Sequence, residues 1–223
     1  MTGIIIAIPK EAEAVLDYFN DIDETTLAGK VCYTGTVDDE PCALVVCEIG
    51  KVNAASATQA LIAAYKPDRI LNLGVCGGIA DQLNICDLLI AEKSIQYDFD
   101  VTELDEVPVG YIQNMKTHML PCDAKMFGAL KKKFKLSTVV ATADRFSSSE
   151  SNAHFIRLHG GEVVDMELAA IAQVCLLNKV PVAAVKCVSD NARGDAKHDF
   201  TRMLARASTL LAINFPAILQ AIK

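Results

Sequence analysis

Apolar and polar positions form alternating blocks that predict strands and helices in turn. Continuous apolar runs predict buried strands over residues 3–8, 69–75, 87–98, 136–144, 161–166 and 180–190, and a hairpin over 30–37 and 41–49. Helical spacing predicts helices over residues 9–19, 51–65, 123–134, 149–159 and 167–177, and a last helix that begins at residue 198. Pro9 suits the first position of its helix, and Asp123 suits an N-cap.

This order of elements predicts an α/β fold. Strands that are apolar along their whole length are typical of a sheet covered by helices on both faces. A chain of 223 residues is long enough for one well-buried domain, and no linker or repeat divides it, so we expect one domain over residues 1–223. The segments 100–121 and 190–199 carry no clear pattern, which is typical of functional loops.

Charge and composition argue against several classes of partner. The formal net charge is −7 and the one basic run, Lys131–Lys133, is short, so we expect no nucleic-acid partner. The most apolar segment, 208–222, contains Asn214 and Pro216 as interruptions, and we expect a helix packed on a core or subunit interface, with no membrane partner. The eight cysteines form no CxxC pair and no signal peptide precedes them, which predicts reduced thiols in a cytoplasmic protein.

Acidic side chains follow several of the predicted strands. In open α/β sheets, ligands bind at the carboxyl ends of the strands, so these positions are the first candidates for a site. The acids in these positions are Glu11, Asp144, Asp165, Glu167 and Asp190. Each has a structural alternative, as a turn residue, an N-cap or an acid in the first turn of a helix. Their coincidence at four strand ends favours one acidic rim.

Neither a P-loop nor a metal site is predicted. The glycine-rich turn at 74–78, "GVCGG", lacks the Lys-Ser/Thr pair that ends a P-loop. The four histidines show no metal-ligand spacing, so we expect no metal and no cofactor.

Seven segments of the chain, in order, are similar to those of a known family. They are "GIIIAIPKEAEAV", "EIGKVNAA", "NLGVCGGIAD", "YDFDVT", "ADRF", "VVDMELAAIAQVC" and "VKCVSD". Together they resemble the purine nucleoside phosphorylase/uridine phosphorylase superfamily, and within it the 5′-methylthioadenosine/S-adenosylhomocysteine nucleosidases. The resemblance implies a three-layer fold with a central mixed β-sheet flanked by helices. It also implies a hydrolase that cleaves the N-glycosidic bond of adenine nucleosides with a 5′-thio substituent, releasing adenine and a thioribose.

The resemblance implies a role for each site residue. Glu11 would activate the attacking water and Asp190 would serve the departing purine. Glu167 would bind the ribose hydroxyls. The other implied contacts are Met166 under the sugar, Phe146, Ser147 and Ser189 at the base, and Ile49, Val75 and Lys186 near the attacking water. The chemistry suits these roles, because cleavage leaves positive charge on the sugar and negative charge on the base. Two carboxyls from different strands fit an inverting displacement by water.

Three positions depart from the nucleosidase pattern. Val75 stands where the nucleosidases usually have Ser, and Lys186 stands where they have Arg. Val75 cannot hydrogen-bond the water, and Lys186 keeps the charge without the fork geometry of arginine. Ser147 replaces an apolar residue, which makes the purine pocket more polar.

The departures leave three alternatives to the nucleosidase. They are another purine nucleoside hydrolase, such as a futalosine-type enzyme, a phosphate-dependent phosphorylase, and a nucleoside-binding protein without chemistry. The glycine turn has neither an arginine nor a hydroxyl to bind a phosphate dianion, which favours water over phosphate as the nucleophile.

The resemblance finally implies a homodimer, in which each subunit lends apolar residues to the pocket of the other for the 5′ substituent. Val107, Pro108, Val109 and Tyr111 are the candidates for that wall, with an ordinary surface loop as the alternative.

Overall fold

The computed structural model describes residues 1–192 and 196–223. The strands in these residues are β1 (Thr2–Ile6), β2 (Asn20–Leu27), β3 (Lys30–Val37), β4 (Glu40–Val46), β5 (Arg69–Gly78), β6 (Leu88–Gln96), β7 (Leu120–Pro121), β8 (Leu136–Thr142), β9 (Val163–Asp165) and β10 (Val182–Asp190). The helices are α1 (Pro9–Leu16), α2 (Lys51–Tyr65), α3 (Ala124–Lys133), α4 (Glu150–Leu158), α5 (Leu168–Asn178) and α6 (Ala196–Ile222).

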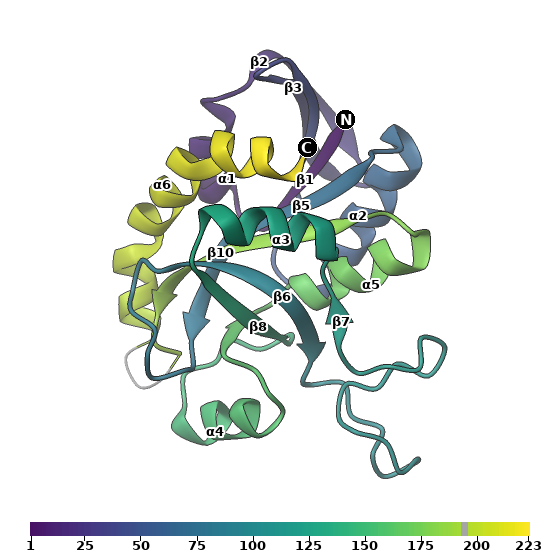
Figure 1. Cartoon of the computed structure of the whole chain (residues 1–223), viewed down its shortest axis with the longest axis vertical. Helices are drawn as coiled ribbons and strands as arrows, with labels where there is room; N and C mark the ends of the chain where they lie inside the picture. The colour runs from purple at the N-terminus through teal and green to yellow at the C-terminus, as the bar shows by residue number, and fades with distance from the viewer. Residues whose placement is uncertain (193–195) are drawn as a thin grey trace.

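These strands form one mixed sheet that curls at one end (Figure 1). From one edge the order is β2-β3-β4-β1-β5, with β1 parallel to both of its neighbours. Beyond this point β5 pairs with β10 in parallel and with β9 in antiparallel orientation, and β10, β6, β8 and β9 complete a ring back to β5. The curl brings the carboxyl ends of β5, β9 and β10 together.

The curl requires close approach of the backbone at Gly77. Gly77 pairs with both Val164 and Asp190. A Cβ added to Gly77 would lie 2.8 Å from the Cβ of Ala192 and 3.0 Å from Oδ1 of Asp190. A side chain at this position would therefore push the end of β10 away from β5.

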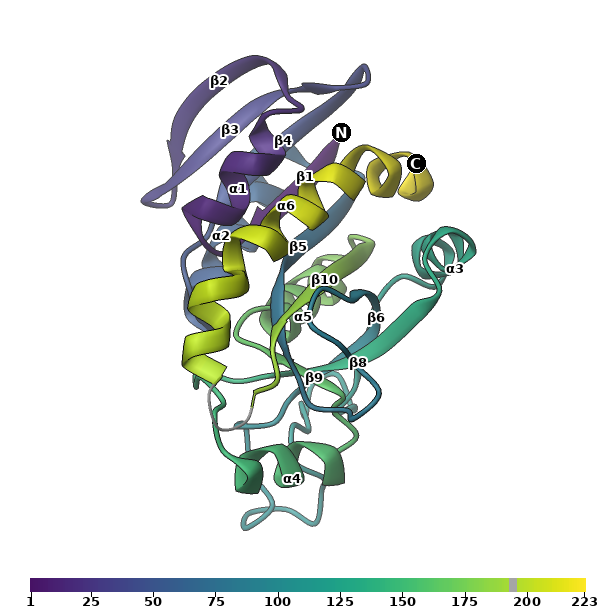
Figure 2. The same cartoon turned by 90° about the vertical axis from the view of Figure 1, so that its left-hand side faces the viewer.

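Helices cover both faces of the sheet (Figure 2). Side chains of α1, α3 and α6 pack with β1, β4, β5 and β10 in one core cluster, and α2 and α5 pack on the opposite face in a second cluster. The predicted α/β fold, with three layers and a central mixed sheet, is confirmed. One domain over residues 1–223 stays a prediction.

Most predicted elements are present, and two differ in a way that has a physical cause. Strand β2 was not predicted, because "NDIDETTL" is polar and nearly every side chain along it is exposed at the edge of the sheet. The glycine-rich segment 74–78 was predicted as a turn, but it continues β5 as a strand paired with β9 and β10.

The last helix begins two residues before the predicted start at residue 198. Helix α6 runs without a break through Asn214 and Pro216, and the expected helix packed on a core is present. Judged by length and composition alone, α6 is long and apolar enough to cross a membrane. Its residues Leu211, Phe215 and Ile218 are buried in the core cluster with α1 and the sheet, as a core helix requires.

The two unpatterned segments differ from each other. The segment 100–121 is irregular apart from β7, and Val109 in it is buried within its own chain. Of the segment 190–199, residues 193–195 lie outside the described residues, and 196–199 belong to α6.

Candidate active site

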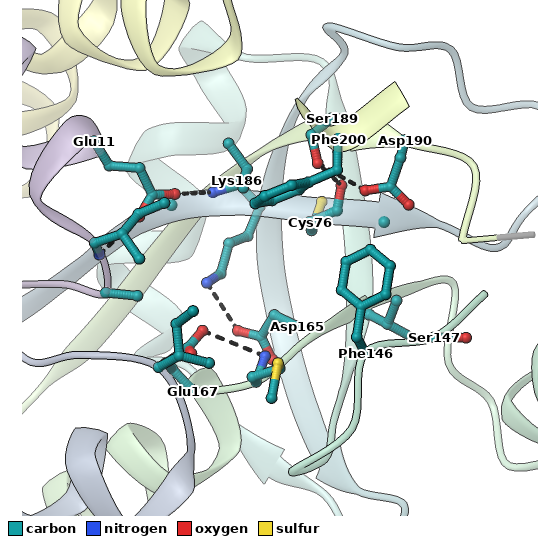
Figure 3. A pocket seen from close by; sticks show the side chains of 18 of the residues that line it. Glu11, Cys76, Phe146, Ser147, Asp165, Glu167, Lys186, Ser189, Asp190 and Phe200 are labelled. Atoms are coloured by element: carbon teal, nitrogen blue, oxygen red, sulfur yellow. Dashed lines mark hydrogen bonds and ion pairs between the residues drawn. The ribbon is translucent and has the colours of Figure 1, made fainter. Parts of the chain in front are cut away.

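One cavity opens at the carboxyl ends of β5, β9 and β10, beside the start of α1 and the end of β8 (Figure 3). Glu11, Glu167 and Asp190 line it, and so do the other residues that the resemblance places at the sugar, the base and the attacking water. The lining residues are Ala7, Ile8, Glu11, Ile49, Asn72, Leu73, Gly74, Val75, Cys76, Gly77, Arg145, Phe146, Ser147, Val164, Asp165, Met166, Glu167, Lys186, Ser189, Asp190 and Phe200.

Glu11 is a buried carboxyl at the first turn of α1. Its Oε2 accepts a hydrogen bond from the backbone N–H of Ile8 at 3.3 Å, which closes the N-terminus of the helix. Its Oε1 accepts a shorter bond, 2.7 Å, from the N–H of Val75 on β5. Burial raises the pKa of Glu11, and the Val75 N–H and the charge of Lys186 offset part of that rise.

Glu167 immediately precedes α5, and its side chain points away from the helix N–H groups. Its Oε1 accepts from the N–H of Gly50 at 3.0 Å, in the loop before α2. The helix is capped instead by Asp165, whose Oδ2 accepts from the N–H of Leu168 at 2.9 Å. Burial, and then the negative charge of Asp165, raise the pKa of Glu167 to about 7.

Asp190 is the last residue of β10 and is buried. Its Oδ1 accepts from the N–H of Ala192 at 2.8 Å, and its Oδ2 accepts from the hydroxyl of Ser189 at 2.9 Å. Burial raises the pKa of Asp190 despite these two hydrogen bonds. Glu11, Glu167 and Asp190, from α1, the start of α5 and β10, thus face the same cavity (Figure 3).

A buried ion pair lies among these carboxyls. Lys186 is 1% exposed, and its Nζ lies 2.8 Å from Oδ2 of Asp165. The hydroxyl of Thr142 donates to Oδ1 of the same carboxylate at 2.5 Å. Burial alone lowers the pKa of Lys186, but the charges of Asp165 and Glu167 more than reverse this and leave it raised. The sequence named both charged residues but gave no sign that they pair.

Two aromatic rings form the opposite wall. Phe146 is 46% exposed, and its ring centroid lies 5.8 Å from that of Phe200 at an interplanar angle of 78°. Ser147 is buried, and its Oγ accepts from Nδ2 of Asn152 at 2.8 Å. Phe200 was missed in the sequence, because an aromatic residue in the first turns of α6 carries no site spacing.

One acid of the predicted rim lies elsewhere. The Oδ1 of Asp144 accepts from the N–H of Lys51 at 2.7 Å, so this carboxylate caps α2 and does not line the cavity. The prediction that four strand ends supply one rim is therefore wrong for Asp144, because the neighbouring helix N-terminus binds it. None of the cavity-lining residues comes from 100–121.

The charges of the cavity are mostly negative. Its described lining holds four carboxyls, Glu11, Asp165, Glu167 and Asp190, against the two cations Arg145 and Lys186. Among residues 1–192 and 196–223, no group of three or more His, Cys, Asp and Glu side chains is placed to hold a metal ion. The arrangement can bind a neutral polar ligand and can move protons on two sides of it.

The family of the chain follows from its match to known proteins. A model described as the phosphorylase superfamily matches residues 2–221. The chain belongs to this superfamily. The resemblance that the sequence motifs carried is thereby confirmed.

Individual members of the superfamily align along nearly the whole chain. A 5′-methylthioadenosine/S-adenosylhomocysteine nucleosidase of Haemophilus ducreyi is 32% identical over 213 residues, which cover 92% of this chain and 91% of the relative. The crystal structure of the nucleosidase of Neisseria meningitidis with methylthio-immucillin-A has a TM-score of 0.94 at 26% identity, covering 99% of this chain and 98% of that one. The futalosine hydrolase of Helicobacter pylori has a TM-score of 0.91 at 26% identity, covering 99% and 96%.

Proposed function

We propose that the protein hydrolyses the N-glycosidic bond of adenine nucleosides that carry a 5′-thio substituent, such as methylthioadenosine and S-adenosylhomocysteine, releasing adenine and a thioribose. The observation that carries this proposal is the convergence of Glu11, Glu167 and Asp190 on one cavity. The nucleosidases of H. ducreyi and N. meningitidis, which align with nearly the whole chain, support the substrate class.

Glu11 is the proposed base for the attacking water. A Cβ built on Gly74 would lie 3.3 Å from Oε1 of Glu11 and 3.5 Å from Nζ of Lys186, so this glycine leaves a gap between an acceptor and a donor. We place the water in this gap. Asn72 supports a polar occupant nearby, since its buried Oδ1 has no hydrogen-bond partner among the described residues.

Glu167 binds the ribose in this proposal. One oxygen is held by the N–H of Gly50, which orients the carboxyl toward the cavity, and the ionised carboxylate accepts from the sugar hydroxyls. As the bond to the base breaks, positive charge grows on the sugar, and a nearby carboxylate stabilises it more than it stabilises the ground state. Met166 packs against the same sugar.

Asp190 assists departure of the purine. A purine leaves slowly as an anion, so a proton donor on its five-membered ring lowers the barrier. Burial raises the pKa of Asp190, which increases the fraction of the carboxyl that holds a proton near neutral pH. Phe146 stacks on the base, with Ser147 and Ser189 beside it.

The charges of the cavity favour water over phosphate as the nucleophile. A phosphate dianion would enter beside Glu11 and Glu167, and of the two cations that line the cavity, Lys186 is already paired with Asp165. The negative charges of the phosphate and of nearby carboxylates repel strongly in a buried site, whereas a neutral water molecule is not repelled.

We also propose a cytoplasmic homodimer. The free state of all eight cysteines supports a reducing compartment. Three large apolar side chains are exposed: Ile49 by 50%, Val52 by 79% and Leu104 by 83%. A subunit interface that removed them from water would stabilise a dimer. Val109 is buried in its own chain, which leaves Val107, Pro108 and Tyr111 as candidates for the wall of the partner's pocket.

A nucleoside panel with and without phosphate tests the proposal. The purified protein is incubated with methylthioadenosine, S-adenosylhomocysteine, futalosine, adenosine and inosine, and the free base is separated by chromatography. We expect adenine from the first two without phosphate. Release that needs phosphate would make the protein a phosphorylase, cleavage of a futalosine-type nucleoside alone would make it that hydrolase, and tight binding without release would make it a binding protein.

A further inference from the structure

We infer that Asp165 is a positioning residue of this site, which holds the ammonium of Lys186 beside Glu11 and Glu167 and so sets the pH range in which those two carboxyls work. The inference rests on the proposed function and deepens it. Neither the resemblance to the nucleosidases nor the proposed mechanism assigns a role to Asp165, although this residue is buried and lines the cavity.

Three contacts hold the carboxylate of Asp165 in place. Strands β8 and β9 run parallel with Thr142 opposite Asp165, so the hydroxyl of Thr142 reaches Oδ1 at 2.5 Å. Oδ2 accepts from the N–H of Leu168 at 2.9 Å and from Nζ of Lys186 at 2.8 Å. The carboxylate is thus fixed by two partners other than the lysine, at a helix N-terminus that favours an anion.

Lys186 needs such an anchor. A lysine ammonium is a compact charge on a flexible chain, and it lacks the rigid fork with which an arginine orients itself. Its Nζ lies 3.5 Å from the position of a Cβ on Gly74, at the edge of the gap where we place the water. Without Asp165, the buried ammonium would turn to the remaining carboxyls, Glu11 and Glu167, and close this gap.

The same arrangement controls the charge of the two working carboxyls. The groups that face Glu167 are Asp165 of β9, Lys186 of β10, Glu11 of α1 and Cys47 after β4. Lys186 and Asp165 also act on Glu11, and in both cases the Asp165 charge raises the pKa. Neutralising Asp165 therefore lowers the pKa of both carboxyls, and the freed ammonium lowers them further.

The first experiment compares the pH profiles of adenine release by the wild type and by Asp165→Asn. We expect the acidic limb of kcat/KM to move to lower pH by about one unit or more, and kcat to fall by up to about 100-fold because the water gap is disturbed. A folded Asp165→Asn variant whose limb coincides with that of the wild type overturns the inference, whatever its activity, since a purely structural role lowers activity without moving the limb.

A matched control is available at the far end of β5. Glu40 accepts from Nη2 of Arg69 at 2.8 Å and from the hydroxyl of Thr2 at 3.0 Å, which repeats the pattern of an ion pair with a threonine donor. Glu40→Gln is expected to lower stability while its pH profile stays that of the wild type. An equal displacement of the limb in Glu40→Gln would show that the shift is not specific to the site and would overturn the inference.

Two more variants keep the test decisive if Asp165→Asn does not fold. Lys186→Met and the double variant Asp165→Asn/Lys186→Met differ only in the charge of Asp165, and the double variant buries no unpaired member of the pair. The double variant should have its acidic limb at the lower pH, and coincident limbs contradict the inference. If the wild type binds methylthioadenosine but releases no adenine, the proposed function fails, and the pH dependence of Kd for the same nucleoside replaces kcat/KM in the comparison.

Discussion

Substitution of Gly74 by alanine tests where the attacking water lies. The added methyl would lie 3.3 Å from Oε1 of Glu11 and 3.5 Å from Nζ of Lys186, so it fills the gap between them and requires only a shift of a few tenths of an ångström in the Glu11 side chain. Gly74 is in the middle of β5, and a strand backbone accepts alanine readily. The substitution therefore removes the water without removing either charged group.

The expected loss follows from what the base contributes. General base catalysis by a positioned carboxylate is worth about 10²- to 10⁴-fold in rate. Exclusion of the water should therefore lower kcat by that factor, which corresponds to about 2.7 to 5.4 kcal/mol in the barrier. The nucleoside should still bind, because the methyl faces Glu11 and Lys186 and not the aromatic wall formed by Phe146 and Phe200.

The assay is release of adenine from methylthioadenosine under saturating conditions, with Kd from calorimetry. Gly128→Ala in α3 is the matched control, since a Cβ at Gly128 has no heavy atom within 4 Å. It should gain about 1 kcal/mol of stability from helix propensity and keep the wild-type kcat. A Gly74→Ala enzyme that turns over at the wild-type rate would refute the position of the water, and with it the role of Glu11 as its base.

Three further predictions concern the site and the assembly. Glu167→Gln should raise the stability of the free protein at pH 8 by about 3 kcal/mol, because the pKa of Glu167 is raised from 4.5 to about 7 and the folded wild type therefore loses stability as pH rises through that interval. Urea unfolding midpoints of both proteins at pH 4.5 and pH 8 measure the effect. A Glu167→Gln midpoint at pH 8 that is no higher than that of the wild type contradicts the prediction. Val75→Ser should raise kcat by about 2- to 10-fold, the worth of one added hydrogen bond to the water, and an unchanged or lower kcat counts against the proposed gap. Val52→Asp places a charge on a side chain that is 79% exposed on α2, and light scattering should then report a monomer where the wild type is a dimer; a dimeric variant would move the interface elsewhere.

The fold was largely predictable because its core strands are apolar on both faces. Residues 51–65 were predicted as a helix with the bounds that α2 has, and Asp123 caps α3 through the N–H of Met126 at 2.9 Å. Strand β2 escaped prediction since its exposed side chains carry no apolar period. Helix α6 was predicted to pack on a core, and it continues through Pro216 because packing of Phe215 and Ile218 on that core outweighs the lost backbone hydrogen bond.

The site was predictable only in part for a different reason. The sequence shows that an acidic residue lies at the end of a strand, but the group that binds its carboxylate depends on the tertiary structure. Asp144 caps α2, and Asp165 of β9 forms an ion pair with Lys186 of β10. Neither contact produces a pattern in the sequence near these residues. The roles of Glu11, Glu167 and Asp190 came from the resemblance to the nucleosidases, and the structure adds that all three face one cavity.

Turnover by the wild type and by Glu11→Gln in phosphate-free buffer tests the central claim most directly. The account predicts that the wild type releases adenine from methylthioadenosine, and that Glu11→Gln binds the nucleoside with a similar Kd but releases adenine at least about 100-fold more slowly. A wild type that is inert until phosphate is added, or a Glu11→Gln enzyme with undiminished turnover, would contradict it.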